Sequence, residues 1–262
     1  MPDRSEPYIT RLMQLGLISE GFLIPDTVAF GKWGPTSQEA YDKFIDSLSA
    51  GGVTGVANAV VMLSQFDKEV DFDEVRQDGI VGIVHRAAQG HSSIDEEYRS
   101  RKEEAHKRNL LWGAYHFGMR GDGVEQARYF LKYVMPDPGD LLVLAHYEID
   151  NYPEMTLKEA EDFVATIHGE TGRWPVLYSK YDFIRRMIAP DPKSALKNCP
   201  LWFSRYGEFA MPEGLWEDWT LWNYTDGTEG DEPRFVFGIG NCSRSKFNGN
   251  VESLKGFWES LK

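Results

Sequence analysis

The chain has 262 residues, and its 41 acidic and 28 basic side chains give a net charge of −13 at pH 7. Non-specific nucleic-acid binding and adhesion to anionic membranes both depend on Lys and Arg, so this charge balance argues against either partner. No apolar run approaches the roughly 20 residues needed to span a bilayer, so membrane insertion is not expected.

The N-terminal sequence, Met1 to Pro7, has no basic segment followed by an apolar core, so we expect no secretory signal. The protein is then expected to be made in the cytoplasm and to leave it only by lysis or through a secretion machine. Two cysteines, Cys199 and Cys242, are too few for a disulfide scaffold. Whether they form a bridge stays open, because sequence spacing does not fix the distance between them.

Residues 1–52 are predicted to form a small helical appendage. An apolar stripe recurs there at helical spacing through Ile9, Leu12 and Leu15. Thr36 to Glu39 has the Ser/Thr-x-x-Glu pattern of a capping box, and Gly51-Gly52 breaks the helical pattern. Through Leu12–Leu17, Gly31 to Pro35 and a helix ending near Phe44, the segment faintly resembles a peptidoglycan-binding helical module, and a simple helical appendage is an equal alternative.

Residues 53–262 are predicted to form a second domain, in which short apolar runs alternate with amphipathic helices. The runs are Ala57–Ser64, Ile80–Arg86, Leu110–Phe117, Leu141–Glu148, Pro175–Ser179, Pro200–Arg205, Thr220–Tyr224 and, weakly, Phe235–Ile239. They are apolar on both faces, as buried parallel strands are. About eight such strands predict an α/β fold, a (β/α) barrel of the TIM type, irregular where the last strands leave no room for full helices.

Two of the intervening helices are well marked. Thr156 to Glu159 is a second capping box, and we expect the helix that it begins to stop at Gly169. Asp95–Asn109 is highly charged and is predicted to be a solvated outer helix, with Glu97 and Arg101 paired at i,i+4.

Function in a barrel of this kind lies at the carboxyl ends of the strands. Aromatic residues are dense there, and flat aromatic faces beside hydrogen-bonding groups suit sugar rings. The candidate binding residues are Ser64, Arg86, Tyr115, His116, His146, Tyr147, Tyr178, Trp202, Tyr206, Trp222 and Tyr224. We expect Tyr115, Trp202, Trp222 and Tyr224 to converge on one mouth; the alternative is that these aromatic residues only close the core.

Carboxylates are scarce at the strand ends despite the acidic composition. Only Glu148 falls clearly at such an end. Four further acids lie a little beyond, in predicted loops: Asp67, Asp71, Asp150 and Asp226.

Several sequence blocks between about Val60 and Trp258 carry a family resemblance. They include Val70-Asp71-Phe72, Ala87-Ala88-Gln89-Gly90, Leu111 to Gly118, Leu141 to Leu144, Gly172 to Ser179, Leu201-Trp202, Trp219 to Gly227 and Gly238 to Cys242. In this order the blocks resemble the glycoside hydrolase family 25 lysozymes, N-acetylmuramidases that cut peptidoglycan. The resemblance implies an irregular, flattened (β/α) barrel and a peptidoglycan-like glycan as partner.

The chain departs from the family pattern at positions that matter for catalysis. The family has Asp-x-Ser at the end of strand one, where this chain has Met62 in place of the Asp and keeps Ser64. The Asp after the final strand corresponds to Ser243. The basic position of strand two is kept as Arg86.

The family's Asp-x-Glu at the end of strand four is also altered. Without a gap, its two carboxylates align with Ala145 and Tyr147, which the spacing favours. A one-residue slip would instead place His146 and Glu148 on them. The resemblance therefore implies that three or all four of the expected carboxylates are missing.

Glycoside cleavage normally needs one carboxylic acid and a second group, usually a carboxylate. The leading hypothesis is therefore a lysozyme-like pseudoenzyme that binds peptidoglycan or a related glycan without cleaving it. One alternative is an active muramidase with Glu148 as catalytic acid and Asp71 or Asp150 as partner. Another is a structural or interaction component of a phage or injection assembly, with a partner protein.

No cofactor or metal is expected. His85, His116 and His146 lie near the ends of three different predicted strands, and three histidines without a companion carboxylate are a weak metal signal. Loss of acids also makes the cleft floor less negative, so an anion such as phosphate or a carboxylate is a further possible ligand.

Overall fold

The computed structural model describes residues 7–19, 32, 34–40, 56–67, 69–148 and 153–261. The chain divides into two compact units, Met1–Gly55 and Val56–Lys262, and each is described by itself.

The first unit contains helix α1 (Pro7–Ser19) and a helical segment over residues 35–40. Gln14 of α1 is buried and donates from Nε2 to Ser37 Oγ (2.8 Å) and to Lys32 O (2.9 Å). The second segment begins at Pro35, so the predicted capping box at Thr36 is wrong. Proline suits a first helical position, because its missing N–H would have no partner there. Gly51-Gly52 lies outside the described residues.

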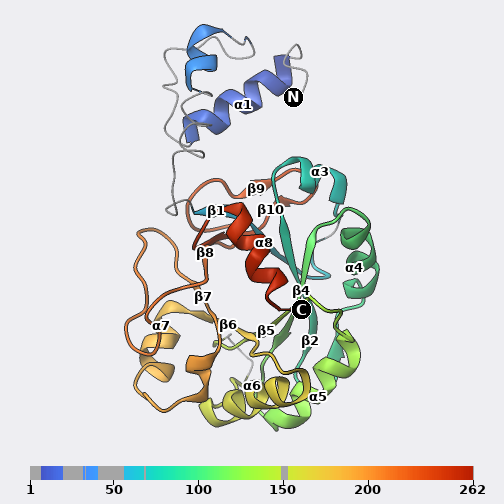
Figure 1. The fold of residues 1–262 in the computed structure, drawn as a ribbon, viewed down its shortest axis with the longest axis vertical. Helices are drawn as coiled ribbons and strands as arrows, with labels where there is room; N and C mark the ends of the chain where they lie inside the picture. Colours follow the sequence, from blue (N-terminus) through green and yellow to red (C-terminus); the bar gives the residue numbers. More distant parts are fainter. Residues whose placement is uncertain are drawn as a thin grey trace. The chain divides into compact units, whose positions relative to one another are not determined.

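In the second unit eight strands close into a barrel (Figure 1). Seven are parallel, in the order β1 (Ala57–Leu63), β2 (Gly82–Gln89), β4 (Leu111–Phe117), β5 (Leu141–Ala145), β6 (Val176–Lys180), β7 (Leu201–Ser204) and β8 (Leu221–Thr225). Strand β11 (Ser243–Phe247) lies between β8 and β1 and is antiparallel to both. The predicted irregular TIM-type barrel is confirmed.

The eighth barrel strand is not the predicted one. Of the expected run 235–239, only β9 (Phe235–Val236) is a strand, and it pairs with β10 (Gly240–Asn241) in a separate hairpin. The barrel strand β11 reads Ser-Arg-Ser-Lys-Phe. A search for apolar runs cannot find it, because an antiparallel strand can carry polar residues on one face. A short strand β3 (Ser93–Ile94) forms a hairpin with β2.

Helices cover the outside of the barrel beside its first strands (Figure 1). They are α3 (Phe72–Gln77), α4 (Tyr98–Lys107), α5 (Gly123–Val134) and α6 (Leu157–Thr171). After β6 come short segments: α7 (Tyr181–Phe183), the π-helical turn η2 (Ile184–Ile188) and the 3-10 turn η3 (Ala195–Asn198). Between β7 and β8, and between β8 and β9, the chain forms no helix, which is the irregularity that the short spacing of the last strands predicts.

Helix α6 begins as its sequence predicts and ends later. Thr156 and Glu159 form both hydrogen bonds of the capping box. The helix continues through Gly169 and ends at Gly172, which adopts φ +75°. The expected stop at Gly169 is wrong, because the left-handed conformation that closes the helix falls on the next glycine.

Alternation along the strands separates two packed layers. Val143, Ala145 and Trp202 belong to the cluster inside the barrel, whereas Leu142, Leu144 and Phe203 belong to the cluster under the helices. Helix α8 (Val251–Glu259) covers the end where the strands begin, since Trp258 Nε1 donates to Trp112 O at 3.0 Å. Helix α8 thus covers the amino ends of the strands, so a functional site is expected at their carboxyl ends. Among the described residues no helix is long and apolar enough to cross a membrane.

Candidate functional site

The carboxyl ends of the barrel strands form a mouth lined by tyrosines. Tyr147 packs edge-on against Phe117 and Tyr178, with ring centroids 5.2 and 5.6 Å apart. Tyr178 in turn packs edge-on against Trp202 at 5.1 Å. Tyr115 lies beside Arg86 on the neighbouring strand. Tyr115, Tyr147 and Tyr178 therefore lie together at one end of the barrel, whereas Trp202 is fully buried against Tyr178 and belongs to the core.

Burial keeps the phenols of the mouth neutral. It raises the pKa of Tyr147 and of Tyr206 to about 12 each, with Asp226 adding to the effect at Tyr206. The pKa values of Tyr115 and Tyr178 are also raised, mainly by burial. Neutral phenols can exchange hydrogen bonds with sugar hydroxyls, but a phenol with a pKa of about 12 is a far weaker acid than a carboxylic acid.

A buried amide below the tyrosines fixes the floor of the mouth. Asn223 Oδ1 accepts a hydrogen bond from Tyr178 Oη at 3.1 Å. Its Nδ2 donates to Ser243 Oγ (2.9 Å) and to Arg244 O (2.8 Å) on β11. Trp202 Nε1 reaches the same strand, at Ser245 Oγ (3.0 Å). The floor is thus a satisfied polar network that holds its rings in place.

Two cationic side chains, Arg86 and Lys180, border the mouth, and each packs on an aromatic ring. Arg86 lies 4.8 Å from the ring of Phe66, and Lys180 lies 5.1 Å from the ring of Tyr147. Arg86 is also paired with the fully buried Asp95, from Nε to Oδ2 at 3.2 Å. Arg86, a predicted site residue, is therefore held rigidly at the mouth.

The inward positions that the family resemblance associates with carboxylates carry none. Met62 faces Ser243 across the β1–β11 pair, and Ser243 bonds the floor amide. Ala145 and Tyr147 both pack on the cluster inside the barrel. The ungapped alignment is therefore the one that the geometry fits, and His146, between them, points outward.

Glu148, the predicted catalytic residue, lies past the end of β5 and is turned to the surface. Its carboxylate is half exposed and forms an ion pair with Arg186 of η2. Lys180 Nζ lies 3.4 Å from its carbonyl oxygen.

The loop acids act mainly as acceptors for backbone N–H groups. Asp71 is the N-cap of α3 and accepts from Asp73 N and Glu74 N, while Asp150 lies outside the described residues. Asp67 Oδ2 accepts a hydrogen bond from Ser64 N at 2.7 Å. The predicted site residue Ser64 is therefore held by a loop acid that follows it in the chain. Asp226 Oδ1 likewise accepts from two amides of its own turn, and its side chain reaches Tyr206. Beyond the effect of burial, the negative charge of Asp67 contributes to the raised pKa of Tyr115, and those of Asp226 and Glu229 contribute to the raised pKa of Tyr206.

Trp222 and Tyr224 do not face the mouth, so that part of the predicted convergence is wrong. Both flank the inward-facing Asn223 on β8 and therefore point to the opposite face. Trp222 packs on Phe209 at 5.0 Å and donates from Nε1 to Arg205 O at 2.7 Å. Tyr224 Oη donates to Pro233 O at 2.6 Å.

The three histidines are separate and buried on the outer face of the barrel. His116 packs between Phe130 and Phe163, with Nε2 on Gln126 Oε1 at 3.1 Å. His146 Nε2 donates to Met155 O at 2.8 Å. Burial lowers the pKa of each of these two, and of His85, to about 4. His116 and His146 are therefore neutral core residues at neutral pH, and the idea of a shared three-histidine metal site is wrong.

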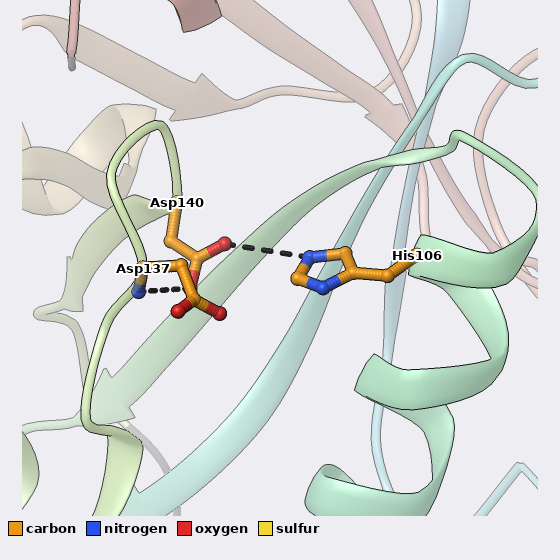
Figure 2. A group of neighbouring side chains, drawn as sticks. All are labelled: His106, Asp137 and Asp140. Atoms are coloured by element: carbon orange, nitrogen blue, oxygen red, sulfur yellow. Dashed lines mark hydrogen bonds and ion pairs between the residues drawn. The ribbon is translucent and has the colours of Figure 1, made fainter.

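One cluster of the described residues has ligand atoms close enough for a cation: His106, Asp137 and Asp140, all within 4.8 Å of one another (Figure 2). Lys102 already occupies it, because its Nζ lies 2.8 Å from Asp137 and 2.6 Å from Asp140. The cluster also precedes β5, at the end of the barrel opposite the mouth. It is best described as an ion-pair network.

A pocket of about 700 Å³ opens beside the mouth, between the loop after β1, the β2–β3 hairpin and the segment after β4. We call it the hairpin pocket. Its lining includes Phe66, Arg86, Gln89, His91, Ser93 and Arg120. None of the described residues that line it is an Asp or a Glu.

Sequence reasoning missed four groups that define this region: Asp95, Asn223, His91 and Arg120. Asp95 and Asn223 carry no local motif, since their partners lie on other strands or loops. Both cysteines are free and buried, so no bridge joins them.

Comparisons with known proteins agree with this geometry. The profile of the glycosyl hydrolases family 25 matches residues 61–232, roughly two thirds of the chain. A muramidase from Acremonium alcalophilum is 26% identical, with a TM-score of 0.66, 76% of this chain and 98% of that one covered. A family 25 lysozyme from Aspergillus fumigatus is also 26% identical, with a TM-score of 0.64, 75% and 96% covered.

A bacterial lysozyme from Streptomyces coelicolor shares the fold at 21% identity and a TM-score of 0.68, with 81% of this chain and 99% of that one covered. No sequence among curated proteins matches significantly. On the profile match and the barrel together, this chain belongs to the glycosyl hydrolases family 25.

Proposed function

We propose that this protein binds peptidoglycan or a related glycan at the barrel mouth and does not cleave it by the two-carboxylate route. One observation carries the proposal: the inward strand-end positions are Met62, Ala145, Tyr147 and Ser243, and none of these has a carboxyl group. Delivery to the wall by lysis or a secretion machine belongs to the same proposal.

The chemistry explains why these positions decide the outcome. One carboxylic acid must protonate the leaving oxygen, and a second group must support the oxocarbenium-like centre or activate water. General acid–base catalysis alone contributes about 10²–10⁴-fold. Tyrosines with raised pKa values are uncharged near pH 7 and are much weaker acids than a carboxylic acid, whereas their rings and hydroxyls can still hold a sugar.

Support for glycan binding comes from the mouth and from the similar proteins. Tyr115, Tyr147 and Tyr178 offer apolar edges beside hydroxyl groups, the usual composition of a small-ligand cleft. The similar structures described above are a muramidase and lysozymes, so their ligand class is the natural first candidate for this chain.

An active hydrolase is the second candidate. Two loop carboxylates, Asp67 and Asp226, act electrostatically on mouth tyrosines, which favours them over Glu148 in its surface ion pair. A structural role in a phage or injection assembly, with a partner protein, stays a prediction. The same holds for a peptidoglycan-binding role of residues 1–52.

The test combines turnover and binding on the same material. Purified full-length protein is incubated with insoluble peptidoglycan, and new reducing ends and the fraction of protein in the pellet are both measured. We expect pelleting without reducing ends above a buffer control. Tyr147→Ala should reduce pelleting, whereas Tyr129→Ala, on the outer helix α5, should not.

Clear release of reducing ends would overturn the proposal. Asp67→Asn, Asp226→Asn and Glu148→Gln would then show which carboxylate is responsible. Failure of the wild-type protein to pellet at any salt concentration would reject glycan binding and favour the assembly role.

A further inference from the structure

The hairpin pocket is lined by two arginines whose guanidinium groups form only part of the hydrogen bonds that they can donate. Arg86 enters it from β2 and bonds Asp95 through Nε. Arg120 enters from the segment after β4 and bonds Glu154 O through Nε at 2.9 Å. Among the described residues no hydrogen-bond acceptor engages the terminal nitrogens of either guanidinium. Two guanidinium groups, each held through its Nε, thus border the same pocket.

Among the described residues that line the pocket there are two arginines and no acid. Asp95, which is fully buried, pairs with Arg86. Glu159 Oε2 lies 3.9 Å from Arg120 Nε. Neither acid lines the pocket, while the imidazole of His91 does. A guanidinium held at Nε presents its two terminal N–H₂ groups as a planar pair, the geometry that a carboxylate or phosphate accepts.

The wall of the pocket that carries His91 is built for close packing. A Cβ at Gly121 would lie 2.1 Å from His91 Nε2, so the ring rests directly on the glycine backbone. Gly121 also has φ +141°, which other residues rarely adopt. The hairpin after β2 and the segment after β4 are thereby held together, and the pocket does not depend on an unsupported loop.

We propose that the hairpin pocket binds an anionic group, a carboxylate or a phosphate, between Arg86 and Arg120. This deepens the proposed function, on which it rests for the identity of the bound molecule: Arg86 also borders the mouth, where its charge acts on Tyr115 and Tyr147. A glycan held by the tyrosines would then place an acidic substituent in the pocket. Chains that carry such a group would bind more tightly than neutral chains.

The pocket is tested first without any glycan. Inorganic phosphate and, separately, acetate are titrated into the full-length protein, and the Nε–Hε NMR signals of Arg86 and Arg120 are followed. Arg86→Lys and Arg120→Lys assign the signals. We expect both signals to shift saturably, with affinity about tenfold weaker in Arg120→Gln. Arg128→Gln, on α5 and outside the pocket, is the matched control and should change nothing.

The source of the anion is tested second, with two disaccharides. The wild-type protein is expected to bind N-acetylglucosaminyl-N-acetylmuramic acid, which has a carboxylate, about tenfold more tightly than the neutral di-N-acetylchitobiose. Arg120→Gln should abolish this preference and leave chitobiose binding unchanged. A saturable phosphate shift without disaccharide preference would support the pocket and identify a free phosphate as its ligand.

The two proposals fail in different ways. Equal binding of both disaccharides, with no saturable shift of either arginine signal, would overturn the anion pocket and leave glycan binding intact. Saturable phosphate binding with no binding of either disaccharide would support the pocket and reject the proposed glycan function.

Discussion

Replacement of Trp222 by Ala separates the packing role of this residue from a role in ligand binding. Its side chain is 7% exposed, points away from the barrel interior, packs on Phe209 and Tyr224, and donates to Arg205 O at 2.7 Å. Truncation of a buried tryptophan costs about 3–5 kcal/mol of unfolding free energy. For a domain of this size each kcal/mol lowers the melting temperature by about 2–4 °C, so we expect a fall of about 6–20 °C.

The assay measures the melting temperature and peptidoglycan pelleting of wild type, Trp222→Ala and Trp222→Phe. Trp222→Phe keeps an aromatic ring, though a smaller one, and loses the hydrogen bond to Arg205 O, so its melting temperature should lie between the other two. At a temperature where every variant is folded, pelleting should be unchanged. A normal melting temperature with lost pelleting would refute this reasoning and place Trp222 in the binding surface after all.

Three further predictions follow from the same geometry. Met62→Asp, Ala145→Asp, Tyr147→Glu and Ser243→Asp together should give measurable reducing-end release if the cleft keeps the family geometry. The stability of this variant should fall, because the new carboxylates at 62 and 243 face each other across the paired strands β1 and β11. A matched control with Met62→Asn, Ala145→Asn, Tyr147→Gln and Ser243→Asn should stay inert. A folded but inert acidic variant would show that the cleft no longer has the geometry that catalysis needs. His116 has a pKa lowered to about 4 by burial, so the folded state disfavours its protonation, and stability present above about pH 6.5 is lost as the pH falls toward 4. Urea unfolding of His116→Phe should show a shallower loss over that range; equal slopes would contradict the buried neutral state. Arg101→Met should lower the melting temperature far more than Arg99→Met, because buried Arg101 donates to Ser64 O at 2.8 Å and to Asp67 O; similar effects of the two would argue against this role.

The sequence by itself determined the class of the fold and the order of most strands. Apolar runs such as Leu141–Glu148 mark buried parallel strands, because both of their faces must be covered. It also showed that Met62, Ala145 and Ser243, at positions where the family resemblance implies carboxylates, carry none. Those properties are local, so reading residues one after another is enough to find them.

Tertiary structure decided which side chains meet. Arg101, which looks like a solvent-facing helix residue, is buried against the loop after β1, and the barrel closes on the polar strand β11. Trp222 and Tyr224 point outward while Asn223 between them points inward, because neighbouring residues on a strand face opposite sides. Only the register of each strand fixes which set faces the mouth, and register depends on pairing between segments far apart in the sequence.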